Sequence, residues 1–264
     1  MKAVPLLVLD RVEKRFGGLK AISQVSFEVY ERQIFGLIGP NGAGKTTLFN
    51  CITGHYRPEA GEVRFRGESI VGQKPHRIAL GGIARTFQNV RLFDEMSVIE
   101  NVLVSGHHRN KAGVLGAFLR TEAYGADERA MHARAQELLE LFELDTLKQE
   151  QAASLPYGSQ RRLEIARALM LEPKLLLLDE PAAGLNSQEA DKLKQQIKWL
   201  RDRFSLAVVL VEHNMRVVMG ACELVHCVDH GETIASGTPE EVQRHPAVLE
   251  AYLGQAKAPA GAPA

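Results

Sequence analysis

The sequence predicts a mixed α/β fold with a parallel-stranded core, an antiparallel sheet near the N-terminus and an inserted helical subdomain. Three observations support this prediction. An apolar segment at 34–38 runs into a glycine-rich turn and then into helix-forming residues, as in a strand–loop–helix unit. Apolar and polar residues alternate at 25–29 and 63–65, which is typical of half-buried antiparallel strands. Helical spacing then replaces the strand patterns over residues 90–158.

The length of 264 residues suits one large α/β domain, which we expect at residues 1–254. Its nucleotide-binding core would consist of 1–89 and 159–254, with 90–158 as the helical subdomain. Residues 255–264 are rich in alanine, proline and glycine, so we expect a disordered tail.

The composition argues against several classes of protein. Basic and acidic residues number 32 each, so no overall field favours nucleic acid. Three cysteines without C-x-x-C spacing argue against a disulfide framework or a zinc site. The N-terminus lacks a secretory signal, and no apolar run is long enough to span a bilayer. We therefore expect a cytoplasmic protein, which would be peripheral if it serves a membrane.

Short elements are expected around the glycine-rich turn. Phe16 lies in a glycine turn between two strand-like segments. A helix should follow the glycine-rich turn as far as Thr53, where Gly54 can end it. Residues 75–80 predict a short helix, and 83–87 predict a strand.

A long helix is predicted in the middle of the chain, because Met131, Ala135, Leu138 and Phe142 recur at helical spacing. The basic, glycine-containing stretch at 107–124 is expected to be a solvated loop with a short helix.

The parallel pattern returns in the last third of the chain. Continuous apolar runs at 175–178 and 207–211 predict strands that are buried on both faces. The other elements expected here are a helix capped by Asn186 and Glu189, a hairpin of 224–228 and 233–235, and a helix capped by Thr238 and Glu241.

The glycine-rich turn matches the phosphate-binding pattern G-x-x-x-x-G-K-[ST] in full. Its backbone N–H groups would converge at the positive end of the next helix, which suits a polyphosphate. Lys45 would reach the β- and γ-phosphates, and the Thr46 hydroxyl would bind Mg²⁺. The alternative is a turn that only joins a strand to a helix. The residues expected to hold the nucleotide are Gly39, Pro40, Asn41, Gly42, Ala43, Gly44, Lys45, Thr46 and Thr47.

Asp179 and Glu180 follow the apolar run at 175–178 and supply the second half of a nucleotide-hydrolysis site. Ligands of open α/β sheets bind at the carboxyl ends of the strands. Asp179 would hold Mg²⁺, and Glu180 could orient the attacking water or accept its proton. The alternative, a strand that merely ends at an acidic turn, loses weight because a full phosphate loop lies upstream.

Residues 155–169 begin with a turn and continue as a helix, whose N-terminus could contact an anion. Taken alone, this is a weak indication of a second phosphate contact. The phosphate loop and Asp179 are separated by a long, largely helical block. A compact small GTPase is excluded, because it has no room for such a block between these two motifs.

Together these motifs resemble the ATPase subunit of an ABC transporter in order and spacing over nearly the whole chain. The resemblance implies ATP and Mg²⁺ as cofactors. It implies that Phe16 stacks on adenine, that Gln88 contacts Mg²⁺ and the attacking water, and that His213 contacts the γ-phosphate. Outside this context, Phe16 and His213 would be taken as structural residues. The matching segments are 39–47, Gln88, 156–160, 175–180 and His213.

The family also implies that two ATPase subunits pair head to tail, with each ATP between the phosphate loop of one and the signature turn of the other. In this chain the signature turn is Tyr157, Gly158, Ser159 and Gln160. The family usually has Leu-Ser-Gly-Gly-Gln there, so Tyr157 replaces the serine that contacts the γ-phosphate. We expect Ser159 or the helix N-terminus to supply that contact. Residues 181–186 would line the shared interface.

Within the family, the chain resembles the branched-chain amino-acid importers, through residues 85–93, 181–186 and 245–254 and through the signature turn. This implies uptake of leucine, isoleucine and valine. The implied partners are a second, different ATPase subunit, two transmembrane permeases and, indirectly, a secreted solute-binding protein, at the cytoplasmic face of the inner membrane. The expected permease contacts are Val90, Leu92, Phe93 and Met96.

Other functions stay open. A urea or amide importer and the lipopolysaccharide-export ATPase are close alternatives to amino-acid import. A non-transport ABC ATPase acting on DNA or ribosomes is more remote, because no coiled coil, tandem unit or basic arm is visible. A small-molecule kinase is disfavoured by the signature turn and by His213.

Overall fold

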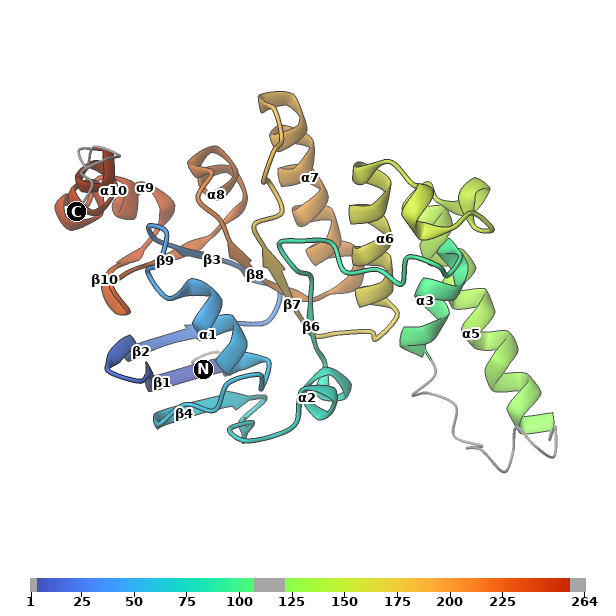
Figure 1. Ribbon diagram of the computed structural model, residues 1–264, viewed down its shortest axis with the longest axis horizontal. Coiled ribbons are helices and arrows are strands. Elements are labelled where there is room, and N and C mark those ends of the chain that lie inside the picture. The colour runs from blue at the N-terminus through green and yellow to red at the C-terminus, as the bar shows by residue number, and fades with distance from the viewer. Residues whose placement is uncertain (1–3, 107–121, 257–264) are drawn as a thin grey trace. The chain divides into compact units, whose positions relative to one another are not determined.

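The computed structural model describes residues 4–106 and 122–256 (Figure 1). The chain forms two compact units, each of which is described by itself. The first unit consists of Met1–Ile78 and Lys174–Ala264, and the second of Ala79–Pro173.

An antiparallel sheet forms the N-terminal part of the first unit, as the alternating pattern predicts. Leu9 pairs with Phe27 on one side and with Val63 on the other. All three side chains are buried, and their neighbours along each strand point to the opposite face. In spatial order the strands are β2 (Leu19–Val29), β1 (Leu7–Phe16), β4 (Ala60–Phe65) and β5 (Glu68–Ser69).

A second, mostly parallel sheet forms the core of the first unit. β3 pairs in parallel with β8 and with β9, and β7 pairs in parallel with β8. Every residue of β3, β7 and β8 is buried, which explains their continuous apolar runs. The carboxyl ends of these strands therefore meet at one edge of the sheet. In spatial order the strands are β10 (Glu232–Gly237), β9 (Leu224–Asp229), β3 (Ile34–Ile38), β8 (Ala207–Val211) and β7 (Leu175–Asp179).

Two helices of the first unit begin at the caps that the sequence predicts. Asn186 and Glu189 form a reciprocal capping box, and so do Thr238 and Glu241. None of the helices described in 4–106 and 122–256 is long and apolar enough to cross a membrane. The helices are α1 (Lys45–Ile52), α7 (Ser187–Phe204), α8 (Met215–Ala221), α9 (Pro239–Gln243) and α10 (Pro246–Ala256), and α2 (Pro75–Gly81) runs from the first unit into the second.

Helices dominate the second unit. α3 packs against both α5 and α6, and Figure 1 shows α3 beside α5. Ala135, Leu138 and Phe142 are buried, as their helical spacing predicts. The predicted subdomain limits of 90 and 158 stay a prediction, since the compact unit also includes the segments on either side. The elements are β6 (Ile83–Arg85), α3 (Val98–Gly106), α5 (Glu122–Leu141), α6 (Tyr157–Leu169) and two 3₁₀ turns (Asp145–Leu147 and Ala152–Ser154).

Three expectations need correction or lie outside the description. The strand predicted at 83–87 ends at Arg85, because the Phe87 N–H donates to Glu164 Oε1 at 3.2 Å and leaves the strand path. Residues 255 and 256 form the end of α10, and the disordered tail expected from 255 onward stays a prediction. Residues 257–264 and most of the basic stretch, 107–121, lie outside the described residues.

Candidate nucleotide-binding site

The phosphate loop has the predicted setting between β3 and α1. Gly39 lies so close to β9 that a Cβ on it would stand 2.0 Å from the Val228 carbonyl oxygen. Gly44, at φ 103°, caps α1 in a left-handed conformation, and a Cβ there would stand 2.6 Å from Ile22 Cδ1. Both positions therefore require glycine. Gly42 meets open space instead, so the tip of the loop is accessible.

Lys45 is buried within the loop that it serves. Its Nζ donates hydrogen bonds to the carbonyl oxygens of Gly39 at 2.7 Å and Pro40 at 2.9 Å. Burial lowers the pKa of Lys45, and the nearby carboxylates of Glu180 and Asp179 act in the opposite direction. The two sequence motifs, far apart along the chain, thus meet at this ammonium group.

Asp179 and Glu180 stand at the carboxyl end of β7. Asp179 is buried and pairs with Val211 of β8. Glu180 has φ 47°, in the left-handed region, and its N–H donates to the Val211 carbonyl oxygen at 2.9 Å. A non-glycine residue in this region is strained, and such strain occurs preferentially at functional sites.

His213 lies beside Glu180, as a shared catalytic role requires. Its Nδ1 is 3.8 Å from Glu180 Oε2, and its side chain is 52% exposed, so the ring is open to a ligand. The structure thus gathers the phosphate loop, Asp179, Glu180 and His213 at one edge of the parallel sheet.

Phe16 ends β1 with its ring 42% exposed, which leaves surface for a nucleobase. The edge of Tyr56 meets this ring at a centroid distance of 5.1 Å, and Lys14 Nζ lies 5.3 Å from its centre. Glu59 binds Lys14 Nζ and the Arg15 N–H, both at 2.6 Å. Tyr56 and Glu59 were not predicted from the sequence. The signal in the sequence for Tyr56 was an aromatic side chain four residues after the end of α1.

Two buried polar residues of the first unit also escaped prediction. Glu212 accepts hydrogen bonds from the loops that carry Glu180 and His213. His226 lies among Phe27 and Phe35, with centroid distances of 5.2 and 6.3 Å. An acidic residue that follows a buried strand, as Glu212 follows β8, was the signal that could have found the first.

Gln88 and the signature turn belong to the second unit. Gln88 is exposed in the segment between β6 and α3. Tyr157 is 51% exposed, and its hydroxyl accepts from Arg161 Nε at 2.9 Å. Ser159 is buried, and its Oγ accepts from Arg162 Nη2 at 3.2 Å. The role of Ser159 in phosphate binding stays a prediction.

The donors of the first unit fit a Mg²⁺–nucleotide. Mg²⁺ prefers oxygen ligands and usually shares them with substrate phosphates. Thr46 supplies an exposed hydroxyl at the start of α1, and Asp179 supplies a carboxylate. The phosphate loop, which requires glycine at 39 and 44 and encloses the Lys45 ammonium, suits the phosphates of the nucleotide.

A groove of about 480 Å³ lies within the second unit. Glu164 is one of its lining residues. Glu164 is buried and accepts hydrogen bonds from the N–H groups of Phe87 at 3.2 Å and Arg91 at 3.4 Å. Burial raises the pKa of Glu164. The Arg167 guanidinium lies 5.7 Å from the Phe93 ring and donates to the Arg91 carbonyl oxygen. The groove thus combines apolar side chains with three arginines, the third being Arg85.

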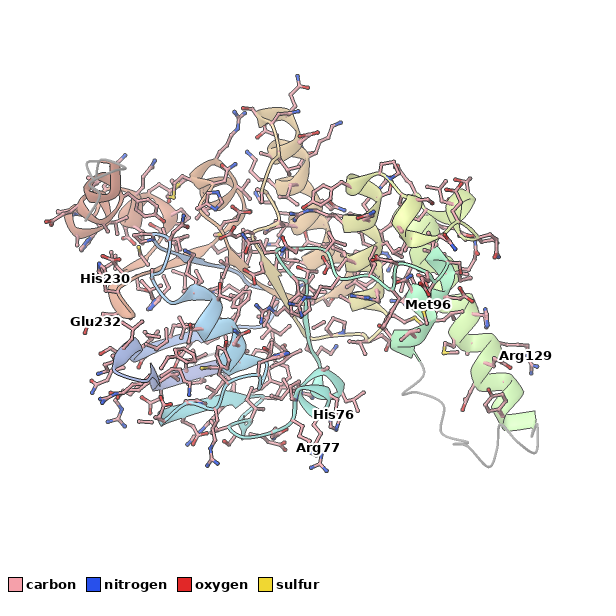
Figure 2. All side chains as sticks on the ribbon, in the orientation of Figure 1. His76, Arg77, Met96, Arg129, His230 and Glu232 are labelled. Atoms are coloured by element: carbon pink, nitrogen blue, oxygen red, sulfur yellow. The ribbon has the colours of Figure 1, made fainter. Side chains whose placement is uncertain are left out.

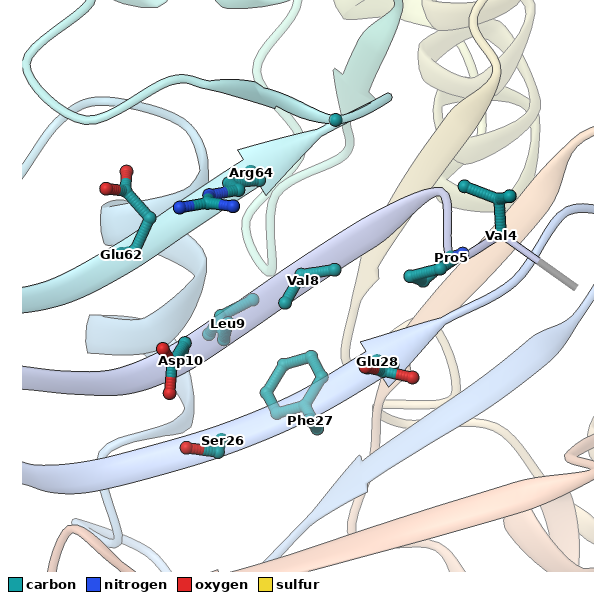
Figure 3. A pocket seen from close by; sticks show the side chains of 11 residues that line it. Val4, Pro5, Val8, Leu9, Asp10, Ser26, Phe27, Glu28, Glu62 and Arg64 are labelled. Carbon is teal, nitrogen blue, oxygen red and sulfur yellow. The ribbon is translucent and has the colours of Figure 1, made fainter. Parts of the chain in front are cut away.

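A larger pocket on the face of the antiparallel sheet does not suit a nucleotide (Figure 3). Asp10, Glu28 and Glu62 give it three carboxylates against the one guanidinium of Arg64. A polyphosphate would be repelled there. The phosphate loop is not among its lining residues.

Comparisons with known proteins identify the family of the chain. A family model described as "ABC transporter" matches residues 22–183, and one described as "Branched-chain amino acid ATP-binding cassette transporter" matches 232–258. The high-affinity branched-chain amino acid transport ATP-binding protein LivG of Salmonella typhimurium is 46% identical, over 96% of this chain and 99% of its own length. The lipopolysaccharide export system ATP-binding protein LptB of Haemophilus influenzae is 35% identical, over 95% and 98%.

Solved structures show the same fold. The ADP conformation of MJ1267, an ATP-binding cassette of an ABC transporter, superposes with a TM-score of 0.82 at 30% identity, over 96% of this chain and 100% of that one. The predicted fold class is thereby confirmed. Because the family model spans more than half of the chain, and a relative 46% identical covers nearly all of it, the chain belongs to the ABC transporter family as an ATP-binding cassette.

Proposed function

We propose that this chain is the ATP-hydrolysing subunit of an ABC importer for the branched-chain amino acids leucine, isoleucine and valine. The observation that carries the ATPase part is the meeting of Lys45, Asp179, Glu180 and His213 at one edge of the sheet. The choice of solute is supported by the match of residues 232–258 to the branched-chain family model and by the identity with LivG.

Each residue of the site has a task in this proposal. The loop N–H groups and Lys45 bind the phosphates, and Phe16 stacks on the adenine. Thr46 and Asp179 would hold Mg²⁺; when bound, the ion neutralises charge on the phosphates. For Gln88 the family resemblance alone suggests a contact with the ion. Glu180 orients the attacking water and takes up its proton, while His213 contacts the γ-phosphate.

The active enzyme in this proposal is a pair of ATPase subunits. The signature turn, Tyr157–Gln160, contacts the ATP held by the phosphate loop of the partner subunit, which we take to be a different paralogue. ATP then favours the closed pair because it contacts both subunits in that state alone. An isolated chain should bind ATP and hydrolyse it poorly.

One of the two permease subunits would dock at the groove of the second unit, whose lining includes Arg91, Leu92 and Phe93. Phe93 and Val104 are 46% and 39% exposed there and supply apolar surface for such a contact. Met96, labelled in Figure 2, adds an exposed side chain just before α3. With three arginines against one glutamate, the groove suits a permease segment that carries apolar residues and an acidic one.

In this proposal the chain works at the cytoplasmic face of the cell membrane, with a secreted solute-binding protein on the other side. The lipopolysaccharide-export alternative is supported by the 35% identity with LptB, which is lower than the 46% with LivG. No observation on the described residues favours nucleic acid or ribosomes.

The test is reconstitution. The chain is produced with two permeases and a second ATPase of the branched-chain importer type from the same organism, placed in proteoliposomes, and supplied with a solute-binding protein of that type. ATP hydrolysis and uptake should both rise with leucine, isoleucine or valine. If lipopolysaccharide or urea stimulates the complex and these amino acids do not, the proposed solute is wrong.

A pair of surface variants tests the docking groove separately. Phe93→Ser should reduce co-purification of the permeases. Leu249→Ser is the matched control, because Leu249 is 47% exposed in α10 and outside the groove. Equal retention of permeases by both variants would contradict docking at this groove.

A further inference from the structure

Glu212 is a fully buried carboxylate whose hydrogen bonds all go to the two loops of the hydrolysis site. It follows β8 directly and has 0% exposure. Its Oε1 accepts from the Ala182 N–H at 2.6 Å. Its Oε2 accepts from the N–H groups of His213 and Asn214, both at 3.1 Å.

The two carboxylate oxygens of Glu212 therefore accept hydrogen bonds from two different loops. Ala182 lies two residues after Glu180, and the Ala183 N–H donates to the Glu180 carbonyl oxygen at 3.1 Å, so the first oxygen holds the turn that carries Glu180. The second oxygen fixes the backbone on which the His213 side chain stands. Glu212 thus holds the backbone of both His213 and Glu180, whose ring nitrogen and carboxylate oxygen lie 3.8 Å apart.

We propose that Glu212 is a positioning residue for ATP hydrolysis, which sets the geometry between Glu180 and His213 by holding both loops through backbone N–H groups. The inference rests on the proposed ATPase function and adds to it a residue that does not touch the nucleotide.

A bidentate buried acceptor is well suited to this task. A burial cost is incurred whenever a carboxylate leaves water, and here three N–H donors offset that cost. An apolar residue at 212 would leave three buried donors without partners, whereas a glutamine can accept at one oxygen only. A glutamine therefore keeps the volume and loses the hold on one of the two loops.

Among the described residues Glu212 makes no hydrogen bond to the phosphate loop, where Lys45 donates instead to the carbonyl oxygens of Gly39 and Pro40. ATP binding and ATP hydrolysis should therefore respond differently. In the assembled complex, Glu212→Gln should lower kcat about tenfold and leave KM for ATP within about twofold. Glu212→Asp, one methylene shorter, serves as a second variant and should also lower kcat.

A double-mutant cycle separates positioning from general damage. If Glu212 acts through the geometry between Glu180 and His213, then Glu212→Gln should lower kcat by a smaller factor in a His213→Ala background than in the wild-type complex. Two independent defects would multiply. Leu200→Ala is the control for stability, because it opens a cavity under α7, away from the site, and should lower the thermal midpoint with kcat retained.

The outcomes are distinct. If the wild-type complex does not hydrolyse ATP, the proposed function and this inference both fail. If it does, and Glu212→Gln keeps kcat within about twofold of wild type, only the inference fails. A double variant whose loss equals the product of the single losses would also overturn it.

Discussion

The Lys45 ammonium donates a hydrogen bond of 2.7 Å to the carbonyl oxygen of Gly39, six residues before it in the same loop. The phosphate loop therefore holds its own cation in place. A nucleotide must compete with the carbonyl oxygens of Gly39 and Pro40 for the Lys45 ammonium. The loop conformation therefore holds the ammonium inside the loop before a phosphate binds.

Replacing Lys45 by methionine should weaken nucleotide binding at least about tenfold, because a charge-assisted hydrogen bond contributes about 1.5–3 kcal/mol. The fold should survive, since the substitution also removes a buried charge. Binding of a fluorescent ATP analogue to the purified chain measures the change. Lys192→Met is the control, because Lys192 is an exposed lysine of α7. Equal affinities of the two variants would remove Lys45 from its role.

Glu180 is the proposed general base and also has a strained backbone, and two substitutions separate these two properties. Glu180→Gln should retain ATP binding and nearly abolish hydrolysis, since an amide cannot accept a proton from water. Glu180→Gly should be equally inactive and yet more stable, by about 1 kcal/mol, because glycine adopts a positive φ without cost.

Turnover of the assembled complex and chemical denaturation of the chain supply the two measurements. Turnover by Glu180→Gln comparable to wild type would exclude Glu180 as the base. A glycine variant less stable than wild type would show that Glu180 makes contacts that outweigh the strain.

Tyr56 should support the adenine platform by holding the ring of Phe16. Base–aromatic stacking contributes about 1–3 kcal/mol per base, so Phe16→Ala should weaken ATP binding by roughly fivefold or more. Tyr56→Ala should have a smaller effect in the same direction, because it frees the ring without removing it. Affinities for ATP and for inorganic triphosphate, compared side by side, isolate the contribution of the base.

A matched control exists for this pair. Trp199 is 38% exposed and meets Phe204 edge-on at 5.9 Å, so Trp199→Ala breaks a similar aromatic pair in α7. It should leave the affinity for ATP unchanged. If Tyr56→Ala behaves like Trp199→Ala, Tyr56 has no part in nucleotide binding.

In the signature turn, Tyr157 replaces the serine that usually contacts the γ-phosphate. The hydroxyl of Ser159 and the N-terminus of α6 are the two candidates to supply that contact instead. Ser159 is buried and bonded to Arg162, so we expect the backbone N–H groups to supply the contact. Ser159→Ala should then keep turnover of the assembled complex within about twofold. A loss of about tenfold would restore the hydroxyl to the role that the sequence suggested for it.

The stability of the first unit should fall in mild acid because of His226. Burial lowers the pKa of His226 to about 4 from an ordinary value of 6.5, so the folded state favours the neutral ring. Nε2 lies 2.9 Å from the Thr233 hydroxyl, and Nδ1 is buried without a partner among the described residues.

A group whose folded pKa is lowered in this way binds its proton in the unfolded state first. Stability is then fully present above pH 6.5 and is lost between pH 6.5 and 4, by about 3 kcal/mol. His226→Gln should flatten this part of the curve of unfolding free energy against pH. Parallel curves for the two proteins would contradict the assignment.

Much of the site is visible in the sequence because its signals are local. The phosphate loop needs glycines, a lysine and a hydroxyl within nine consecutive residues. Asp179 and Glu180 stand directly after a run of buried residues, and both capping boxes lie within four residues. Each pattern can be recognised without knowing what packs against it. The resemblance then assigned roles to Phe16, Gln88 and His213 that their local sequence does not carry.

The sequence by itself therefore determined the fold class, the family and the residues that we propose for phosphate binding, since short-range backbone geometry and hydrophobic periodicity specify these. Only the tertiary structure decided the left-handed backbone of Glu180, the contact of Tyr56 with Phe16, and the hold of Glu212 on Ala182 across 30 residues of chain. The physical reason is that each of these depends on which buried donor or ring a neighbouring element presents. That choice arises from packing between segments far apart in the chain.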